Sequence, residues 1–125
     1  MKPEAPAQAA WADVRHGWQQ LYGAADQGIS LEWHDFKTSR PLDWGESFRP
    51  RSVEFCLNLD GRGAIGGARR APLSYVPSSS GYYALGDQPL HATREAHDRH
   101  RFVTLEFSRE HLQQQAVLFA GGGGQ

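Results

Sequence analysis

The stretch that decides the fold is Val53-Glu54-Phe55-Cys56-Leu57-Asn58-Leu59-Asp60-Gly61, the most regular alternating run in the chain. Apolar and polar residues follow one another with a period of two, which predicts a β-strand over 53–59. One face of this strand carries Val53, Phe55, Leu57 and Leu59, and the other carries Glu54, Cys56 and Asn58. The segment Asp60-Gly61-Arg62-Gly63 then predicts a hairpin, because glycine accepts the positive φ of such turns.

Short strands are also expected on both sides of this run. Proline and glycine separate apolar or alternating segments at close spacing, and Ser78-Ser79-Ser80-Gly81 predicts a turn. The further predicted strands are 31–37, 64–65, 73–76, 82–85, 90–95 and 101–107. Many short strands with frequent turn signals favour a mainly β domain, built as a barrel or a sandwich.

One helix is predicted at each end. Residues 8–22 place Trp11, Val14, Trp18, Leu21 and Tyr22 at helical spacing, with Gly23 as the stop. Ser108 predicts the cap of a second helix that runs to Phe119, with Leu112, Ala116 and Phe119 on one face. The glycine run 121–124 predicts a flexible tail over 121–125.

Composition narrows the classes of function. The formal charge is −1 and basic residues form no cluster, which argues against DNA binding by this chain alone. Cys56 is the only cysteine, so no intrachain disulfide can form, and we expect a cytoplasmic protein. No run approaches the roughly 18 apolar residues of a membrane span, and residues 1–6 do not read as a signal peptide.

The segment 53–83 resembles the core of a cupin barrel. Glu54 and Gly61 have the spacing of the glutamate and glycine in the first cupin motif, and Tyr75-Val76-Pro77 resembles the strand-to-proline step of the second. The resemblance implies a cupin-like jelly-roll β-barrel with an N-terminal and a C-terminal helix.

Over roughly residues 30–119 the chain resembles the N-terminal domain of AraC-type transcriptional regulators. The resemblance is carried by Arg40-Pro41-Leu42-Asp43-Trp44, by 53–61 and by 100–108. In that family the N-terminal barrel binds an effector or dimerises, and a separate C-terminal pair of helix-turn-helix motifs binds DNA. The resemblance therefore implies a small-molecule effector, a homodimer, and contact with DNA only through a C-terminal domain that this sequence does not contain.

No metal or cofactor is expected. Cupin enzymes hold a metal with a His-x-His pair, the glutamate and a later histidine, but here Phe48-Arg49-Pro50-Arg51 and Tyr82 stand at the histidine positions. Only Glu54 remains of the four ligands, so we predict no catalytic residue and no enzyme. His91, His97 and His100 form the densest histidine group, which reads either as a zinc site or, with more weight, as a solvated loop. Cys56 is interpreted as a packed structural residue.

Which face of strand 53–59 lines the interior stays open. The cupin analogy turns Glu54 inward, whereas simple burial turns the apolar face inward, and a shift of one residue exchanges the two faces. The predicted pocket residues are Trp33, Glu54, Tyr75, Tyr82 and Arg94, and each of them also reads as core or surface packing. The predicted dimer contact is the Leu112, Ala116 and Phe119 face.

We therefore expect three segments: a lead-in and helix over 1–28, a cupin-like regulatory barrel with its C-terminal helix over 29–120, and the tail. The predicted function is effector sensing, dimerisation or both, as part of an AraC-type regulator. The alternatives are a stand-alone cupin-like binding protein or enzyme, and a structural barrel that only dimerises.

Overall fold

The computed structural model describes residues 5–47, 49, 51–67, 73–84 and 90–115. The chain begins with helix α1 (Ala5–His16) and continues with strand β1 (Trp18–Ala24), the 3₁₀ turn η1 (Ala25–Gln27) and strand β2 (Ile29–Lys37). The remaining elements are β3 (Leu42–Asp43), η2 (Trp44–Ser47), β4 (Ser52–Asp60), β5 (Gly63–Gly67), β6 (Leu73–Tyr75), β7 (Ser79–Ala84), β8 (Leu90–Arg94) and β9 (Arg99–Ser108). Residues 109–115 are helical.

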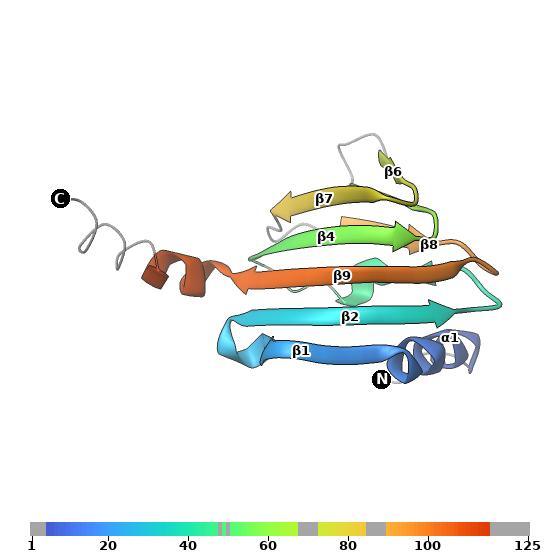
Figure 1. The fold of residues 1–125 in the computed structure, drawn as a ribbon, viewed down its shortest axis with the longest axis horizontal. Coiled ribbons are helices and arrows are strands. Elements are labelled where there is room, and N and C mark those ends of the chain that lie inside the picture. Colours follow the sequence, from blue (N-terminus) through green and yellow to red (C-terminus); the bar gives the residue numbers. More distant parts are fainter. Residues whose placement is uncertain (1–4, 48, 50, 68–72, 85–89, 116–125) are drawn as a thin grey trace.

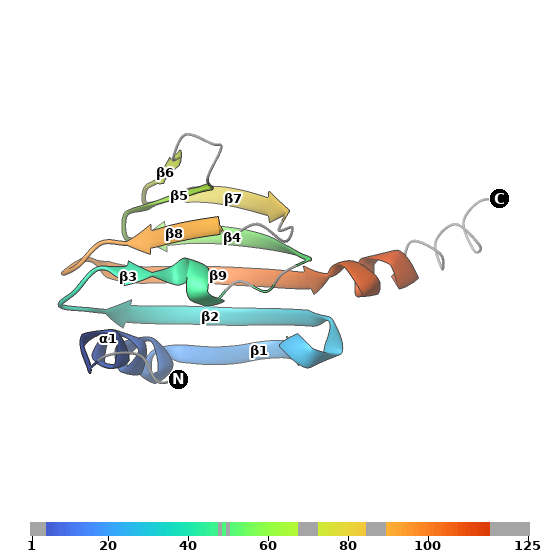
Figure 2. The same ribbon diagram turned by 180° about the vertical axis from the view of Figure 1, so that it is seen from behind.

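The strands form two sheets. The larger has five strands in the order β1-β2-β9-β4-β7, and the smaller has four in the order β3-β8-β5-β6. The smaller sheet lies behind the larger one in Figure 1 and in front of it in Figure 2, where η2 covers the inner face near β9. Both sheets contribute to one apolar core, which includes Phe36, Phe102, Ile65 and Ala92.

The chain is mainly β, as predicted, but the described residues do not form a closed barrel. Each sheet keeps two edge strands, β1 and β7 in the larger sheet and β3 and β6 in the smaller. All strand pairs are antiparallel. The closed barrel of the sequence prediction is therefore replaced by two open sheets that pack face to face.

Strand β4 turns its polar face inward. Glu54 is 5% exposed, and Cys56 and Asn58 are also buried, whereas Phe55 and Leu57 are 42% and 50% exposed on the outer face. The question that the sequence left open is thus decided in favour of the cupin analogy. An interior lined by polar groups is the consequence.

The N-terminal helix is shorter than predicted. It ends at His16, and Gly17 instead pairs with β2, where the amide of Asp35 donates to the Gly17 carbonyl at 2.9 Å. A Cβ at residue 17 would overlap the backbone of Asp35, so this close approach requires glycine. Trp18, Leu21 and Tyr22 therefore belong to a strand, because long-range pairing with β2 outweighs their helical spacing.

Two predicted turns also differ. Strands β4 and β5 do not pair, so Asp60–Gly63 is a corner that carries the chain from one sheet to the other. Gly61 still has the positive φ of 99° that the sequence predicted, and a Cβ there would overlap the ring of His100. The predicted turn 78–81 is shorter, because Ser79–Gly81 already belong to β7.

Ser108 caps the C-terminal helical segment as predicted, since its Oγ accepts a hydrogen bond from the amide of His111 at 3.0 Å. Leu112 lies in this segment and is half-buried. Ala116, Phe119 and the glycine run 121–124 lie outside the described residues. Among the residues that the structure describes, no helix has the length and apolar character needed to cross a membrane.

Candidate small-molecule site

A cavity of about 490 Å³ lies against the inner face of the larger sheet. Its floor comes from β2, β9 and β4, and its walls come from α1, the start of β1, η2 and Arg49. The lining residues are Trp11, Val14, Arg15, Trp18, Glu32, His34, Trp44, Ser47, Arg49, Glu54, Thr104 and Glu106.

Strand register gathers the polar floor. On β2 the inward positions are Ser30, Glu32 and His34, and on β9 they are Thr104 and Glu106. Glu32 stands opposite Thr104, and Glu54 of β4 stands opposite Glu106. Because side chains alternate along a strand, this register brings three carboxyl groups to one side of the sheet.

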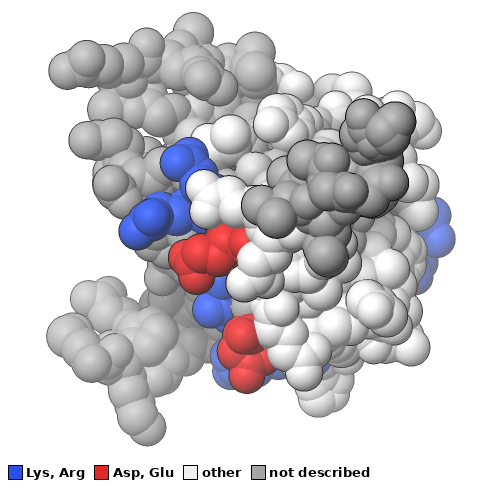
Figure 3. All heavy atoms as spheres, turned by 90° about the vertical axis from the view of Figure 1, so that its left-hand side faces the viewer, with Lys and Arg blue, Asp and Glu red and all other residues white. Residues whose placement is uncertain are grey.

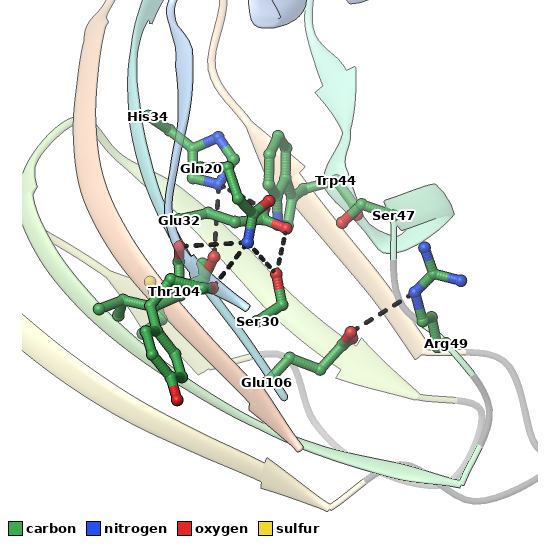
Figure 4. Close-up of polar contacts among 12 residues, drawn as sticks. Gln20, Ser30, Glu32, His34, Trp44, Ser47, Arg49, Thr104 and Glu106 are labelled. Atoms are coloured by element: carbon green, nitrogen blue, oxygen red, sulfur yellow. Dashed lines mark hydrogen bonds and ion pairs between the residues drawn. The ribbon is translucent and has the colours of Figure 1, made fainter. Parts of the chain in front are cut away.

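Glu32 is the best-paired carboxylate of the floor. It accepts from His34 Nε2 at 3.0 Å and from Ser30 Oγ at 2.9 Å, and Gln20 Nε2 donates to the same serine hydroxyl at 2.9 Å (Figure 4). Burial raises the pKa of Glu32, but the hydrogen bonds from His34 and Ser30 outweigh it, so the net pKa is lowered. Since a carboxylate only accepts, His34 Nε2 carries the proton in this pair.

Glu54 and Glu106 behave in the opposite way. Burial, followed by the nearby charges of Glu106 and Glu32, holds the pKa of Glu54 well above its usual range. Burial also raises the pKa of Glu106, against the effect of Arg49, whose Nε lies 3.5 Å from the Glu106 carboxylate (Figure 4). The floor thus combines one carboxyl group, Glu32, that ionises more readily than usual with another, Glu54, that holds its proton to higher pH.

Two buried polar groups of the lining have no partner among the described residues. They are the Nδ1 atom of His34 and the Nε1–H group of Trp44. Buried polar groups in proteins are almost always hydrogen-bonded, since leaving one unpaired costs about 1–3 kcal/mol. Two of them around one cavity indicate that something polar completes the site.

Aromatic rings form the wall above this floor. Trp11 stacks on Trp44 with ring centroids 5.7 Å apart, and Trp44 meets His34 edge-on at 4.8 Å. His34 in turn stacks on Phe102 at 4.7 Å. These ring contacts hold the indole of Trp44, which carries the Nε1–H group, in place beside the cavity.

A second polar cluster fills the interior between β4, β8 and β9. Arg94 is 2% exposed and donates to Asn58 Oδ1 at 2.7 Å, with His100 Nδ1 at 3.4 Å. Its guanidinium lies 3.7 Å from the Phe102 ring centroid and 4.5 Å from that of Tyr75. Burial lowers the pKa of Arg94. Protein groups surround this guanidinium, so the cluster reads as a packed plug rather than a cavity wall.

The five residues predicted for the pocket are therefore spread over three places. Glu54 lies in the cavity, and Arg94 and Tyr75 lie together in the neighbouring plug. Trp33 is on the outer face of β2, and Tyr82, 59% exposed, packs on Phe55 outside β4 at 5.0 Å. Neither of these last two reaches the cavity.

Sequence reasoning missed most of the lining. Glu32, His34, Trp44, Thr104 and Glu106 were not singled out, although the alternation of Glu32, His34 and Phe36 in the predicted strand 31–37 was visible. The available signal was that Glu32 and His34 share one face of this predicted strand with the apolar Phe36. What the sequence could not supply was the neighbouring strand, β9, that brings Glu106 to the same place.

The structure also shows where the three histidines considered as zinc ligands lie, and where Cys56 lies. His91 is exposed beside Asp43, His97 stands in a turn with a positive φ of 69°, and His100 is buried with Nε2 2.8 Å from the Glu95 carbonyl oxygen. Over the described ranges, no three His, Cys, Asp or Glu side chains are arranged to hold a metal ion. Burial raises the pKa of Cys56 to about 11, as expected of a packed thiol.

Comparison with solved structures identifies the class of fold. The chain resembles a cupin superfamily protein from Desulfitobacterium hafniense (12% identity, TM-score 0.54, 73% of this chain and 75% of that one). It also resembles a Ralstonia eutropha protein provisionally assigned as a mannose-6-phosphate isomerase (13%, 0.54, 73% and 82%) and an HTH_3 family transcriptional regulator from Vibrio cholerae (11%, 0.52, 80% and 58%). The chain has the cupin fold. Neither a model of a known family nor a curated protein sequence matches it.

Proposed function

We propose that this chain is a small-molecule-binding domain of cupin fold that senses an effector. The observation that carries the proposal is the cavity of about 490 Å³ with two buried, unpartnered polar groups in its lining. A volume of this size suits a small ligand, and a few aimed polar groups on an aromatic wall are typical of such sites. The metal ligands of cupin enzymes are replaced at the corresponding positions, which favours binding without turnover.

The effector would act on a transcriptional regulator of the AraC type. The sequence resemblance supports this role, and a cupin-fold domain also occurs in the Vibrio cholerae regulator, which shares the fold at 11% identity. In this proposal, DNA binding belongs to a separate helix-turn-helix domain. On the described surface seen in Figure 3, acidic and basic residues are interspersed and form no basic stripe. The free thiol of Cys56 fits the proposed cytoplasmic location.

An effector changes the output only if it binds two arrangements of the protein with different affinity. Helix α1 is suited to report occupancy, because Trp11, Val14 and Arg15 line the cavity from that helix. A ligand that fills the cavity would therefore stabilise one position of α1 relative to β2, which α1 contacts.

We also propose a homodimer, with the outer face of the larger sheet as its contact. Phe55, Leu57 and Tyr82 are exposed there beside half-buried Trp33 and Leu105. The ionic groups at the border of this face are already paired within the chain, Arg99 with Asp35 and Arg101 with Asp60. A neutral apolar face suits a second copy of itself, because like charges would repel across a two-fold interface. The Leu112 face would extend the same contact.

The test of effector binding is a screen of small metabolites by calorimetry, followed by a variant that fills the cavity. Ser47→Phe adds bulk from η2 into the lining, and we expect it to abolish binding with little loss of stability. Ser39→Phe, at an exposed bend, is the matched control and should bind normally. Loss of binding in both variants, or in neither, would contradict this site.

A second candidate function is enzymatic. Glu32 and Glu54 have pKa values displaced in opposite directions, and such a pair can divide the roles of base and acid. Any ligand found by calorimetry should therefore be incubated with the protein in deuterated water. Deuterium incorporation at a carbon atom, lost in Glu32→Gln, would favour an enzyme over a sensor.

A further inference from the structure

We propose that the ligand of the cavity is a small organic cation, whose ammonium group lies against Glu54 and Glu106. The inference rests on the binding function proposed above and adds the chemical class of the ligand. It follows from the charge of the floor, from the position of the basic residues and from the unpartnered groups of the lining.

The floor is short of positive charge. Glu32, Glu54 and Glu106 all face the cavity, and His34 is already engaged with Glu32 at 3.0 Å. Around Glu54 the charges of Glu106 and Glu32 have a larger effect than that of Arg94, so the local field is negative. An ammonium group is the species that such a field stabilises, and an anion such as a phosphate would be repelled by it.

The lining holds two basic residues. Arg49 has an exposed side chain, and its Nε lies 3.5 Å from the Glu106 carboxylate. Arg15 is exposed on α1. Neither is among the charged groups that shift the pKa of Glu54. Of the three carboxyl groups in the lining, Glu32 is thus paired with His34 and Glu106 with Arg49, whereas no ion pair to Glu54 is found among the described residues.

The second, independent observation is the unpartnered indole of Trp44. This side chain is 5% exposed, lines the cavity, and its Nε1–H group has no acceptor among the described residues. A ligand that carries an oxygen acceptor besides its ammonium group would satisfy this donor. Trp11 and Trp18 offer aromatic surface to the same cation.

Cation binding should release a proton from Glu54. Burial holds the proton on its carboxyl group to higher pH than usual, and a nearby positive charge favours the ionised form. The titratable or charged groups that line the same cavity or interact with Glu54 are Glu32 and His34 on β2, Glu106 on β9, Cys56 on β4, Tyr75 on β6, Tyr83 on β7, Arg94 on β8, Arg15 on α1, and Arg49 after η2. Affinity for a cation is therefore expected to rise with pH, and affinity for a neutral ligand is not.

The experiment compares benzylamine, benzyl alcohol and benzoate, which share a ring and differ in charge. The Trp33→Phe variant removes the outer-face tryptophan, so that fluorescence reports Trp11, Trp18 and Trp44 of the cavity. We expect benzylamine to bind at least about tenfold more tightly than benzyl alcohol, and benzoate not to bind. Tighter binding of the alcohol or of benzoate would overturn the cation inference and leave the binding function intact. If none of the three probes binds, the result would count against both the cation inference and the proposed binding function.

Calorimetry in two buffers of different ionisation enthalpy then measures how many protons are released when benzylamine binds. We expect release of on the order of one proton per benzylamine. Glu54→Gln should abolish this release and weaken benzylamine binding by about tenfold or more, while Glu110→Gln, an exposed glutamate on the C-terminal helical segment, should change neither. Unchanged proton release in Glu54→Gln would contradict the assignment. Glu106→Gln provides the second test, since it should also weaken benzylamine but not benzyl alcohol.

Discussion

Glu54 of β4 and Glu106 of β9 stand directly opposite each other on neighbouring antiparallel strands, and both side chains line the same cavity. Like charges at such positions repel, so this pair is stable only when at least one carboxyl group is neutral or a cation lies nearby. Burial raises the pKa of Glu54 and so favours it as the protonated member. This one cross-strand pair therefore links the fold, the protonation state of the site and the class of ligand.

The pair predicts how stability depends on pH. A carboxyl group whose pKa is raised in the folded state favours folding at low pH and opposes it as pH rises above the unfolded value of about 4.5. The folded chain should thus lose stability as pH rises through the pKa of Glu54. Glu54→Gln removes this loss, so we expect the variant to equal the parent near pH 4 and to exceed it at pH 8 by about 1 kcal/mol or more. Urea unfolding at the two pH values measures this, and a variant that is less stable at pH 8 would show that the carboxylate is needed.

The Glu32–His34 pair should behave with the opposite sign. Because the pKa of Glu32 is lowered in the folded chain, its contribution to stability is present above about pH 4.5 and is lost as pH falls through the folded value. His34→Phe keeps an aromatic ring beside Phe102 but removes one of the donors to Glu32, so that Ser30 Oγ remains. We expect a loss of about 1–3 kcal/mol at pH 7, measured by urea unfolding. His91→Phe, at an exposed position, should change the free energy by less than about 0.5 kcal/mol.

Arginine-to-lysine changes at a buried and at an exposed position show how much the buried guanidinium contributes to stability. Arg94 is held by Asn58 and packed between the rings of Tyr75 and Phe102, whereas Arg99 pairs with Asp35 on the surface. An ammonium group can reproduce neither the planar stacking nor the geometry at Asn58. We expect Arg94→Lys to cost about 2 kcal/mol or more, and Arg99→Lys less than about 1 kcal/mol. Equal costs would mean that the Arg94 plug contributes little to the fold.

The local sequence pattern was sufficient to predict most of the strands, but it missed β1 and could not show which strands pair with each other. The alternation at 53–59 predicted β4, and the resemblance to cupins placed Glu54 inside. Residues 8–22 were predicted as one helix because Trp11, Val14 and Trp18 fit a helical period, yet Trp18 lies in β1 and pairs with His34 of β2. The Asp60–Gly63 turn chemistry was likewise read as a hairpin. A corner between two sheets requires the same glycine as a hairpin does. The two can be told apart only by the strands with which β4 and β5 pair, and those strands are distant in sequence.

The candidate site was harder to predict for the same reason. Glu54 was found because its spacing to Gly61 matched a motif. Glu32 and Glu106 lie in strands far apart in sequence, and a charged residue in a strand usually faces solvent. Their inward position depends on the β2–β9 register and on the cover that α1 and η2 provide. Trp33 and Tyr82 were also predicted to line the pocket, but they lie on the outer sheet face.

That outer face gives the last prediction. If two copies pair through the larger sheet, a charge at its centre must be buried without a partner and should disrupt the dimer. Leu57→Lys places this charge at a side chain that is 50% exposed in one copy, so the folded monomer should tolerate it. Val76→Lys is the matched control, because Val76 is equally exposed but lies in the connection between β6 and β7, outside the strands of the larger sheet. Sedimentation equilibrium should show a dimer for the parent and for Val76→Lys, and a monomer for Leu57→Lys. A monomeric parent at high concentration would contradict the dimer itself, whereas a dimeric Leu57→Lys would move the contact to another surface, such as the Leu112 face.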